Sequence, residues 1–119
     1  MSIYADIILD HYQYPRNNKK LDVPTSTVDV SNPLCGDELH MELIEKNGKV
    51  VEIGFTAVGC AISIASASML TEYVKGKRVK DLVEISKDDV LRLLNIELTP
   101  NRIKCALLSW EALKKLMDS

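Results

Sequence analysis

The chain has 119 residues, about the length of one domain, and we expect residues 1–119 to form a single domain with its own hydrophobic core. Apolar residues make up 46% and charged residues 27% of the sequence, which excludes a disordered tail and a coiled coil. Lys and Arg number 15 against 17 Asp and Glu, and this net charge of −2 argues against a nucleic-acid-binding protein, which normally carries a basic excess.

The N-terminal half predicts one helix followed by three strands. Apolar residues recur at helical spacing over residues 4–12, and residues 27–30 form a short strand candidate. Apolar and polar residues then alternate over 39–44 and again over 51–55. The pair Asn47-Gly48 between them favours a two-residue turn, because both positions need a positive φ. These last two segments are therefore expected to pair as an antiparallel hairpin.

The C-terminal half predicts helices only. An Ala- and Ser-rich segment over 61–74 is typical of a helix, and residues 79–83 suggest a short helical turn. Ser86 caps a helix that runs through Leu94, and Thr99-Pro100 opens a last helix that reaches about residue 117. One helix, three strands and then helices imply an α+β fold, with a small three-stranded antiparallel sheet and helices packed on one face.

Apolar spacing also predicts which helix faces are buried. The stripe expected on the helix over 61–74 consists of Ile62, Ala65, Met69 and Tyr73. The stripe expected on the last helix consists of Ile103, Ala106, Leu107, Trp110, Leu113 and Met117.

Three cysteines, Cys35, Cys60 and Cys105, are an odd number and cannot form a closed set of disulfides. The chain shows no apolar run long enough to cross a membrane, and residues 1–6 lack the features of a signal peptide. We therefore expect a cytoplasmic protein with reduced thiols. Each cysteine alone is more often a buried core residue than a ligand; as a set they can also be metal ligands or reactive thiols.

The predicted hairpin brings two of these cysteines together. Cys35 precedes one strand and Cys60 follows its partner, so both lie near the same end of the sheet. Asp37 adds a carboxylate two residues after Cys35. Cys60 stands just before a helix, whose N-terminus favours a thiolate, and Cys105 is expected in the first turns of the last helix.

Three thiolates and one carboxylate are a poor match for a permanent site. Structural zinc sites prefer four Cys or His ligands, and electron-carrying iron–sulfur clusters usually have four thiolates. An oxygen ligand on exposed loops favours an exchangeable metal or cluster. The set therefore points to delivery or activation of metal or sulfur.

Several segments carry a resemblance to a known family. They are Asp10-His11-Tyr12, Pro15-Arg16-Asn17, Asn32-Pro33-Leu34-Cys35-Gly36-Asp37, Gly59-Cys60-Ala61-Ile62-Ser63, and Arg102-Ile103-Lys104-Cys105-Ala106. Over nearly the whole chain the sequence resembles the iron–sulfur cluster scaffold family of IscU, SufU and the NifU N-terminal domain, with its SufE/NifU-like α+β fold.

The resemblance implies a cluster scaffold. A cysteine desulfurase would pass persulfide sulfur to Cys35, Cys60 or Cys105, a transient 2Fe-2S cluster would form on these cysteines with Asp37 completing the site, and apo iron–sulfur proteins would receive it. Family members also bind zinc at these four positions. A monomer or weak homo-oligomer is expected, with no nucleic-acid or membrane partner.

Two departures keep alternatives open. IscU-type members carry histidine where this chain has Lys104, which cannot ligate a metal when protonated. The last helix looks SufU-like, although the cysteine spacing is short and IscU-like. A zinc-dependent SufU-type sulfurtransferase is therefore the alternative, and a purely structural zinc domain is a third interpretation. The stretch Leu98–Arg102 keeps only Leu98 and Pro100 of the family's chaperone-recognition sequence, so a chaperone is the weakest partner expectation.

Overall fold

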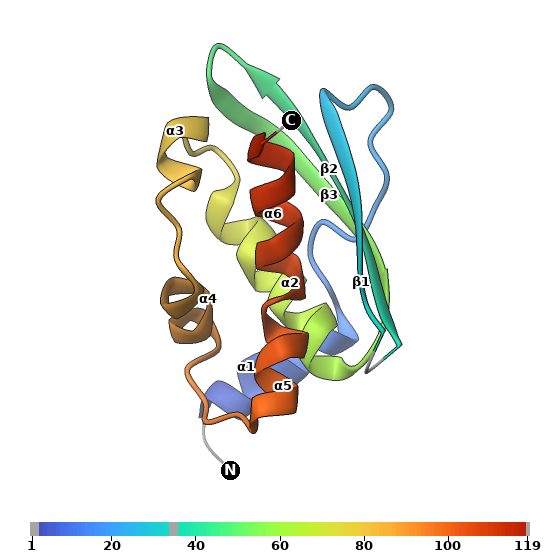
Figure 1. Cartoon of the computed structure of the whole chain (residues 1–119), viewed down its shortest axis with the longest axis vertical. Coiled ribbons are helices and arrows are strands. Elements are labelled where there is room, and N and C mark those ends of the chain that lie inside the picture. Colours follow the sequence, from blue (N-terminus) through green and yellow to red (C-terminus); the bar gives the residue numbers. More distant parts are fainter. Residues whose placement is uncertain (1–2, 34–35, 119) are drawn as a thin grey trace.

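The computed structural model describes residues 3–33 and 36–118, with the helices on one side of the sheet (Figure 1). The elements in chain order are α1 (Ile3–Gln13), β1 (Ser26–Asn32), β2 (Asp37–Lys46), β3 (Lys49–Val58), α2 (Ala61–Val74), α3 (Val79–Leu82), α4 (Lys87–Leu94), α5 (Pro100–Ala106) and α6 (Leu108–Asp118). This order confirms the predicted α+β fold class. None of the described helices has the length and apolar character needed to span a bilayer.

The three strands form one antiparallel sheet in the order β1-β2-β3. Val30 faces Leu39, which in turn faces Ala57 on β3. Asn47 and Gly48 both have positive φ, at 54° and 76°, as the predicted hairpin turn requires. Because β2 and β3 are antiparallel, the start of β2 and the end of β3 lie at the same end of the sheet.

The outer edge of β3 is covered by backbone from two other segments. The Phe55 amide donates to the carbonyl oxygen of Asn17 at 2.9 Å, and the Val50 amide donates to that of Lys77 at 2.9 Å. In the described part of the chain, β1 pairs with β2 alone. The β3 edge of the sheet is therefore hydrogen-bonded to other backbone segments, whereas the β1 edge pairs with no further strand among the described residues.

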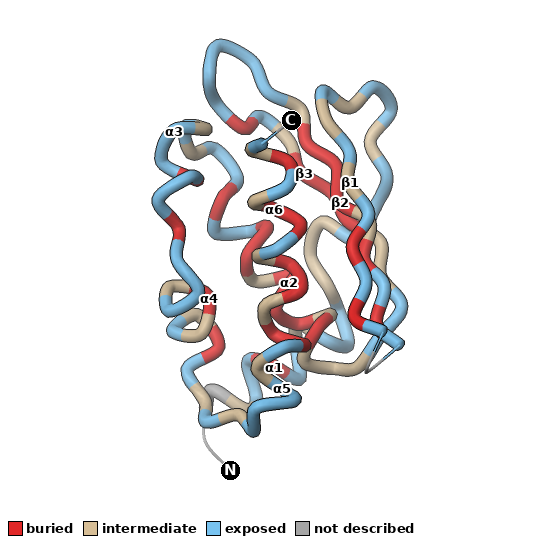
Figure 2. The backbone as a smooth tube through the Cα atoms, viewed as in Figure 1, coloured by how far each residue is buried: buried red, intermediate tan, exposed pale blue. Residues whose placement is uncertain are grey.

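The main core lies between the sheet and the helices. Figure 2 shows buried residues gathered where α2 and α6 meet the strands. Side chains from all three strands meet apolar residues of α2 and α6; the largest that are fully buried include Met41, Leu43, Ile53, Phe55, Leu70, Leu108 and Leu113.

The expected stripe on α2 is only one part of its buried surface. Ala65 is buried in a small apolar cluster with Ile8 and Leu94, and Ile62 and Met69 are half-buried and pack against that cluster, whereas Tyr73 is 43% exposed. The buried residues are mostly small or hydroxyl-bearing: Ser63, Ala65, Ser66, Ala67, Ser68, Leu70, Thr71 and Val74. The reason is that α2 packs against α1, α4 and α5 as well as β3 and α6, so it is buried on more than one side. A single-stripe pattern does not describe such a helix.

The expected single last helix is interrupted. It divides at Leu107, whose φ of −90° and ψ of −1° end α5, and α6 begins at the next residue. The buried residues of the two helices are Cys105, Ala106, Leu108, Ser109, Ala112, Leu113 and Leu116. Of the expected face, Ala106 and Leu113 are buried, and Leu107, Trp110 and Met117 are half-buried against the main core, so the buried surface is wider than the expected face. Cys105 therefore lies near the end of a short helix, not in the first turns of a long one.

Candidate metal-binding site

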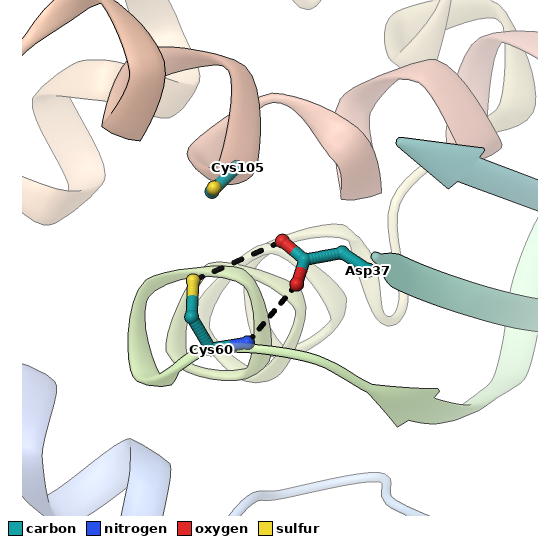
Figure 3. Close-up of side chains that lie close together, drawn as sticks. All are labelled: Asp37, Cys60 and Cys105. Atoms are coloured by element: carbon teal, nitrogen blue, oxygen red, sulfur yellow. Dashed lines mark hydrogen bonds between the residues drawn. The ribbon is translucent and has the colours of Figure 1, made fainter. Parts of the chain in front are cut away.

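Three of the four predicted ligand residues come together at one end of the sheet. Asp37 begins β2, Cys60 immediately precedes α2, and Cys105 lies in the last turn of α5 (Figure 3). One ligand atom from each, a carboxylate oxygen and two sulfurs, lies within 4.8 Å of the other two. Cys35, the fourth predicted ligand, is outside the described residues.

Asp37 contacts Cys60 through both carboxylate oxygens. Its Oδ1 accepts a hydrogen bond from the Cys60 backbone amide at 3.2 Å, and its Oδ2 accepts one from the Cys60 thiol, with Sγ at 3.8 Å. The residue is only 3% exposed. Asp37 therefore fixes the start of α2 and also presents an oxygen beside the sulfur.

Gly59 leaves the space that these groups occupy. A Cβ at this position would lie 2.6 Å from the Ser63 hydroxyl oxygen and 2.7 Å from Asp37 Oδ1. Both distances are shorter than real Cβ contacts, so a side chain here would displace the hydroxyl or the carboxylate. The glycine is required by close approach of side chains, because its φ is not in the left-handed region.

Buried hydroxyl groups hold Cys105 and α5 against α2. Ser66 on α2 donates to the carbonyl oxygen of Ala106 at 2.6 Å and lies 3.1 Å from the hydroxyl of Ser109. Cys105 itself is 3% exposed, whereas Cys60 is half-buried. Sequence reasoning assigned no role to Ser63 or Ser66. For Ser63 the available signal was its position three residues after a helix N-cap, which returns its side chain to the first turn.

The helix ends affect the two sulfurs differently. Cys60 is the N-cap residue of α2, as predicted, and the partial positive charge of that end is favourable for an anionic sulfur. Cys105 lies at the C-terminal end of α5, where the helix dipole is negative. The expectation that Cys105 benefits from a helix start is therefore wrong. The neighbouring side chains of Arg102 and Lys104 are exposed.

Neither histidine joins this ligand group within the described residues. His40 is hydrogen-bonded to Glu42 at 2.9 Å and to Asp29 at 2.8 Å, and the bond to Glu42, followed by that to Asp29, raises the pKa of His40. His11 lies 2.7 Å from the Ser68 hydroxyl, and its pKa is lowered by burial and then by Arg16. Both histidines have structural partners.

The donor set suits a borderline or soft metal ion. Two sulfurs and a carboxylate oxygen are ligands for zinc or for iron in a sulfur-rich site. In a tetrahedral zinc site with bonds of about 2.3 Å, sulfur ligands lie about 3.8 Å apart, so a group spread over 4.8 Å needs only small side-chain movements to close on an ion. A tetrahedral site needs one ligand in addition to these three described donors.

Comparison with known proteins gives a consistent picture. Residues 3–118 match the family model described as the NifU-like N terminal domain. The zinc-dependent sulfurtransferase SufU of Bacillus subtilis is 39% identical over 132 aligned residues, which cover 96% of this chain and 88% of SufU. Since this chain has only 119 residues, that alignment contains gaps in it.

Scaffold proteins are similar to the chain as well. The iron–sulfur cluster assembly scaffold protein IscU of Haemophilus influenzae is 34% identical, with 93% of this chain and 90% of IscU covered. A crystal structure of a NifU-like protein (N-terminal) from Brucella abortus superposes with a TM-score of 0.79 at 20% identity, covering 98% of this chain and 92% of the other. This last likeness bears on the fold alone.

Proposed function

Because the chain belongs to the NifU-like N-terminal domain family, we propose that it is a scaffold on which iron–sulfur clusters are assembled. Cys35, Cys60 and Cys105 would hold a transient 2Fe-2S cluster, with Asp37 as the oxygen ligand, and apo iron–sulfur proteins would receive it. The observation that carries the proposal is the convergence of Asp37, Cys60 and Cys105, from three elements far apart in sequence, to within 4.8 Å.

Sulfur would arrive as the persulfide of a cysteine desulfurase. A scaffold thiolate attacks the terminal sulfur of that persulfide, a new sulfur–sulfur bond forms on the scaffold, and the desulfurase cysteine leaves as a thiolate. This transfer involves no net oxidation. Conversion of each transferred sulfur to sulfide then takes two electrons, which a thiol reductant or a one-electron carrier protein would supply. Cys35, Cys60 and Cys105 are the acceptor candidates; of the two described, Cys60 is the more exposed.

The position of Asp37 supports a site that releases its cargo. Its carboxylate accepts hydrogen bonds from the Cys60 amide and thiol, so it has partners to return to when it leaves a metal. Oxygen is also a weaker ligand than thiolate for the iron of a cluster. We propose that residues 1–119 work as one unit, in a reducing cytoplasm where these thiols remain free.

A second function, zinc-dependent sulfur transfer, is favoured by one specific observation. SufU of Bacillus subtilis, named a zinc-dependent sulfurtransferase, is 39% identical to this chain. In this alternative zinc would occupy the same residues, and a group from the desulfurase would replace one ligand, freeing a thiolate to accept sulfur.

Anaerobic reconstitution tests the scaffold proposal. The full chain, incubated with ferrous iron, cysteine, a cysteine desulfurase and a thiol reductant, is expected to develop thiolate-to-iron charge-transfer absorption, which an apo-ferredoxin then removes. The variant Cys60→Ala is expected to form no stable cluster. Absence of the absorption in the wild-type chain would contradict the scaffold function.

Removal of zinc separates the two functions. The protein is purified without air, its zinc is removed with a chelator, and sulfur acceptance from the desulfurase is measured. A scaffold is expected to accept persulfide sulfur without zinc. A zinc-dependent transferase would lose sulfur acceptance on zinc removal and regain it on zinc addition. The second result, together with failure to assemble a cluster, would replace the scaffold function by the transferase function.

A further inference from the structure

The hydroxyl group of Ser63 lies beside the sulfur of Cys60. Ser63 stands in the first turn of α2 and is only 1% exposed. Its hydroxyl donates to the carbonyl oxygen of Cys60 at 3.0 Å, and its oxygen lies 3.8 Å from Cys60 Sγ. A buried polar side chain of the helix therefore contacts a proposed metal ligand directly.

The Ser63 hydroxyl and the Asp37 carboxylate both lie beside Gly59 and the Cys60 sulfur. A Cβ on Gly59 would meet both groups, the hydroxyl oxygen at 2.6 Å and Asp37 Oδ1 at 2.7 Å. The Cys60 sulfur thus has two oxygen neighbours, each at 3.8 Å. An ionised carboxylate can only accept hydrogen bonds, whereas a hydroxyl can also donate one. Of these two neighbours, Ser63 alone can stabilise an anionic sulfur.

We propose that Ser63 is a positioning residue for the cargo, which donates a hydrogen bond to the Cys60 sulfur when that sulfur binds a metal. The inference rests on the proposed function only in that Cys60 binds metal through sulfur. Rotation of the hydroxyl redirects its proton from the Cys60 carbonyl to the sulfur. The carbonyl keeps a partner, because the Ile64 amide also donates to it, at 3.2 Å.

The hydrogen bond has a spectroscopic consequence. A donor to a metal-bound thiolate withdraws electron density from the sulfur, and hydrogen bonds to sulfur are among the factors that tune sulfur-ligated metal centres. Charge transfer from sulfur to metal then needs more energy. Loss of the donor should move the charge-transfer band to longer wavelength and weaken metal binding.

Ser68 provides a matched control on the same helix. It is fully buried, and its hydroxyl accepts from the Arg16 amide at 2.8 Å and lies 2.7 Å from His11 Nδ1. Its hydroxyl therefore contributes to the packing of α2 against the N-terminal segment, and both of these partners are outside the metal group. Ser63→Ala and Ser68→Ala remove the same atom from two buried positions of one helix.

The experiment is a titration of the metal-free full chain with Co²⁺, followed by absorption. Ser63→Ala is expected to shift the thiolate-to-cobalt band to longer wavelength and to weaken Co²⁺ binding by about 10- to 100-fold, as loss of an outer-shell partner does. Ser68→Ala is expected to keep the wild-type band. The band is read on the bound protein, so a lower stability alone does not move it. An unchanged band in Ser63→Ala, or an equal shift in Ser68→Ala, overturns the inference.

The result is separable from the fate of the proposed function. If the wild-type chain assembles and transfers a cluster while the Ser63→Ala band stays unchanged, only the role of Ser63 is lost. If the wild-type chain gives no thiolate-to-cobalt band at all, the metal site is wrong and the proposed function fails with it. Ser63→Thr, which keeps the hydroxyl, is expected to restore the wild-type band position.

Discussion

The N-termini of α2 and α4 are built in contrasting ways. At α4, Ser86 accepts from the Asp89 amide at 3.2 Å and Asp89 accepts from the Ser86 amide at 2.9 Å, a complete capping box within four consecutive residues. At α2, the N-cap residue is Cys60, whose side chain caps no amide of the helix. Instead, the carboxylate of Asp37, on β2, accepts the Cys60 amide.

The difference separates stability from function. A capping box uses side chains of the helix itself and serves only that helix. The borrowed carboxylate at α2 ties the helix to the sheet and leaves the thiol of Cys60 available as a ligand. The start of α4 thus contributes to stability alone, whereas the start of α2 lacks a local side-chain cap and lies where the proposed metal ligands meet.

The largest effects are expected for Asp37, which both caps the start of α2 and is a proposed metal ligand. Asp37→Ala and Asp37→Asn should each weaken Co²⁺ binding by more than the ~100-fold that loss of an outer-shell partner causes, since both remove the carboxylate that is proposed to bind the metal directly. Only Asp37→Ala also removes the acceptor of the Cys60 amide. Its free energy of unfolding should therefore be roughly 1–3 kcal/mol lower than that of Asp37→Asn. Cobalt titration and urea unfolding measure the two effects. Equal unfolding free energies for the two variants would contradict the capping role.

Gly59→Ala tests how closely the α2 site is packed. The added Cβ would collide with the Ser63 hydroxyl and the Asp37 carboxylate, and we expect Co²⁺ affinity to fall by about 10- to 100-fold. Gly76→Ala is the control, because Gly76 has a φ of +85° and a Cβ added there would meet no atom within 4 Å, so only backbone strain of about 1 kcal/mol is added. Cobalt affinity should distinguish them; similar affinities for both variants would contradict the packing argument.

Ser86→Ala should alter α4 without altering the metal site. Loss of the N-cap hydroxyl is expected to lower the free energy of unfolding by about 1 kcal/mol. Co²⁺ affinity should stay at the wild-type value, since Ser86 is on an element that contributes none of the described ligands. Denaturant unfolding with and without Co²⁺ measures both quantities. A changed metal affinity would show that the two helix starts are coupled.

The smallest effect concerns the pH dependence of the α4 cap. Hydrogen bonds from the Ser86 amide and then the Ser86 side chain lower the pKa of Asp89. Because the folded pKa is depressed, the cap stabilises the fold at pH values above about 4 and is lost as the pH falls through the folded pKa. Urea unfolding of wild type and Asp89→Asn, compared from about pH 6 downward, should show the stability difference shrinking with acid. A constant difference would refute this linkage.

The local features of the fold were predictable from sequence because their causes are close together along the chain. Ser86 and Asp89 are three residues apart, and Asn47-Gly48 supplies both positive φ values of the hairpin. The proximity of Asp37 to Cys60 followed from the same hairpin, since antiparallel pairing fixes which strand ends meet.

The remaining features depend on tertiary packing. Nothing in the sequence around Leu107 marks a helix end, because neither glycine nor proline is present there, so the α5–α6 division could not be predicted. The hydroxyls of Ser63 and Ser66 gained their roles from partners supplied by the fold, so a pattern of apolar residues could not reveal them.

The unequal edges of the sheet limit how copies of this protein can associate through strands. Backbone from Asn17 and Lys77 occupies the β3 edge, and Lys19 lies over Gly54 so closely that a larger residue would collide with it. Strand addition is thus directed to β1. Two molecules joined edge to edge at β1 would form one continuous sheet whose two outer strands are both β3. Because the β3 edges are already hydrogen-bonded to other backbone, association by this route would stop at a dimer and would not continue into a fibre.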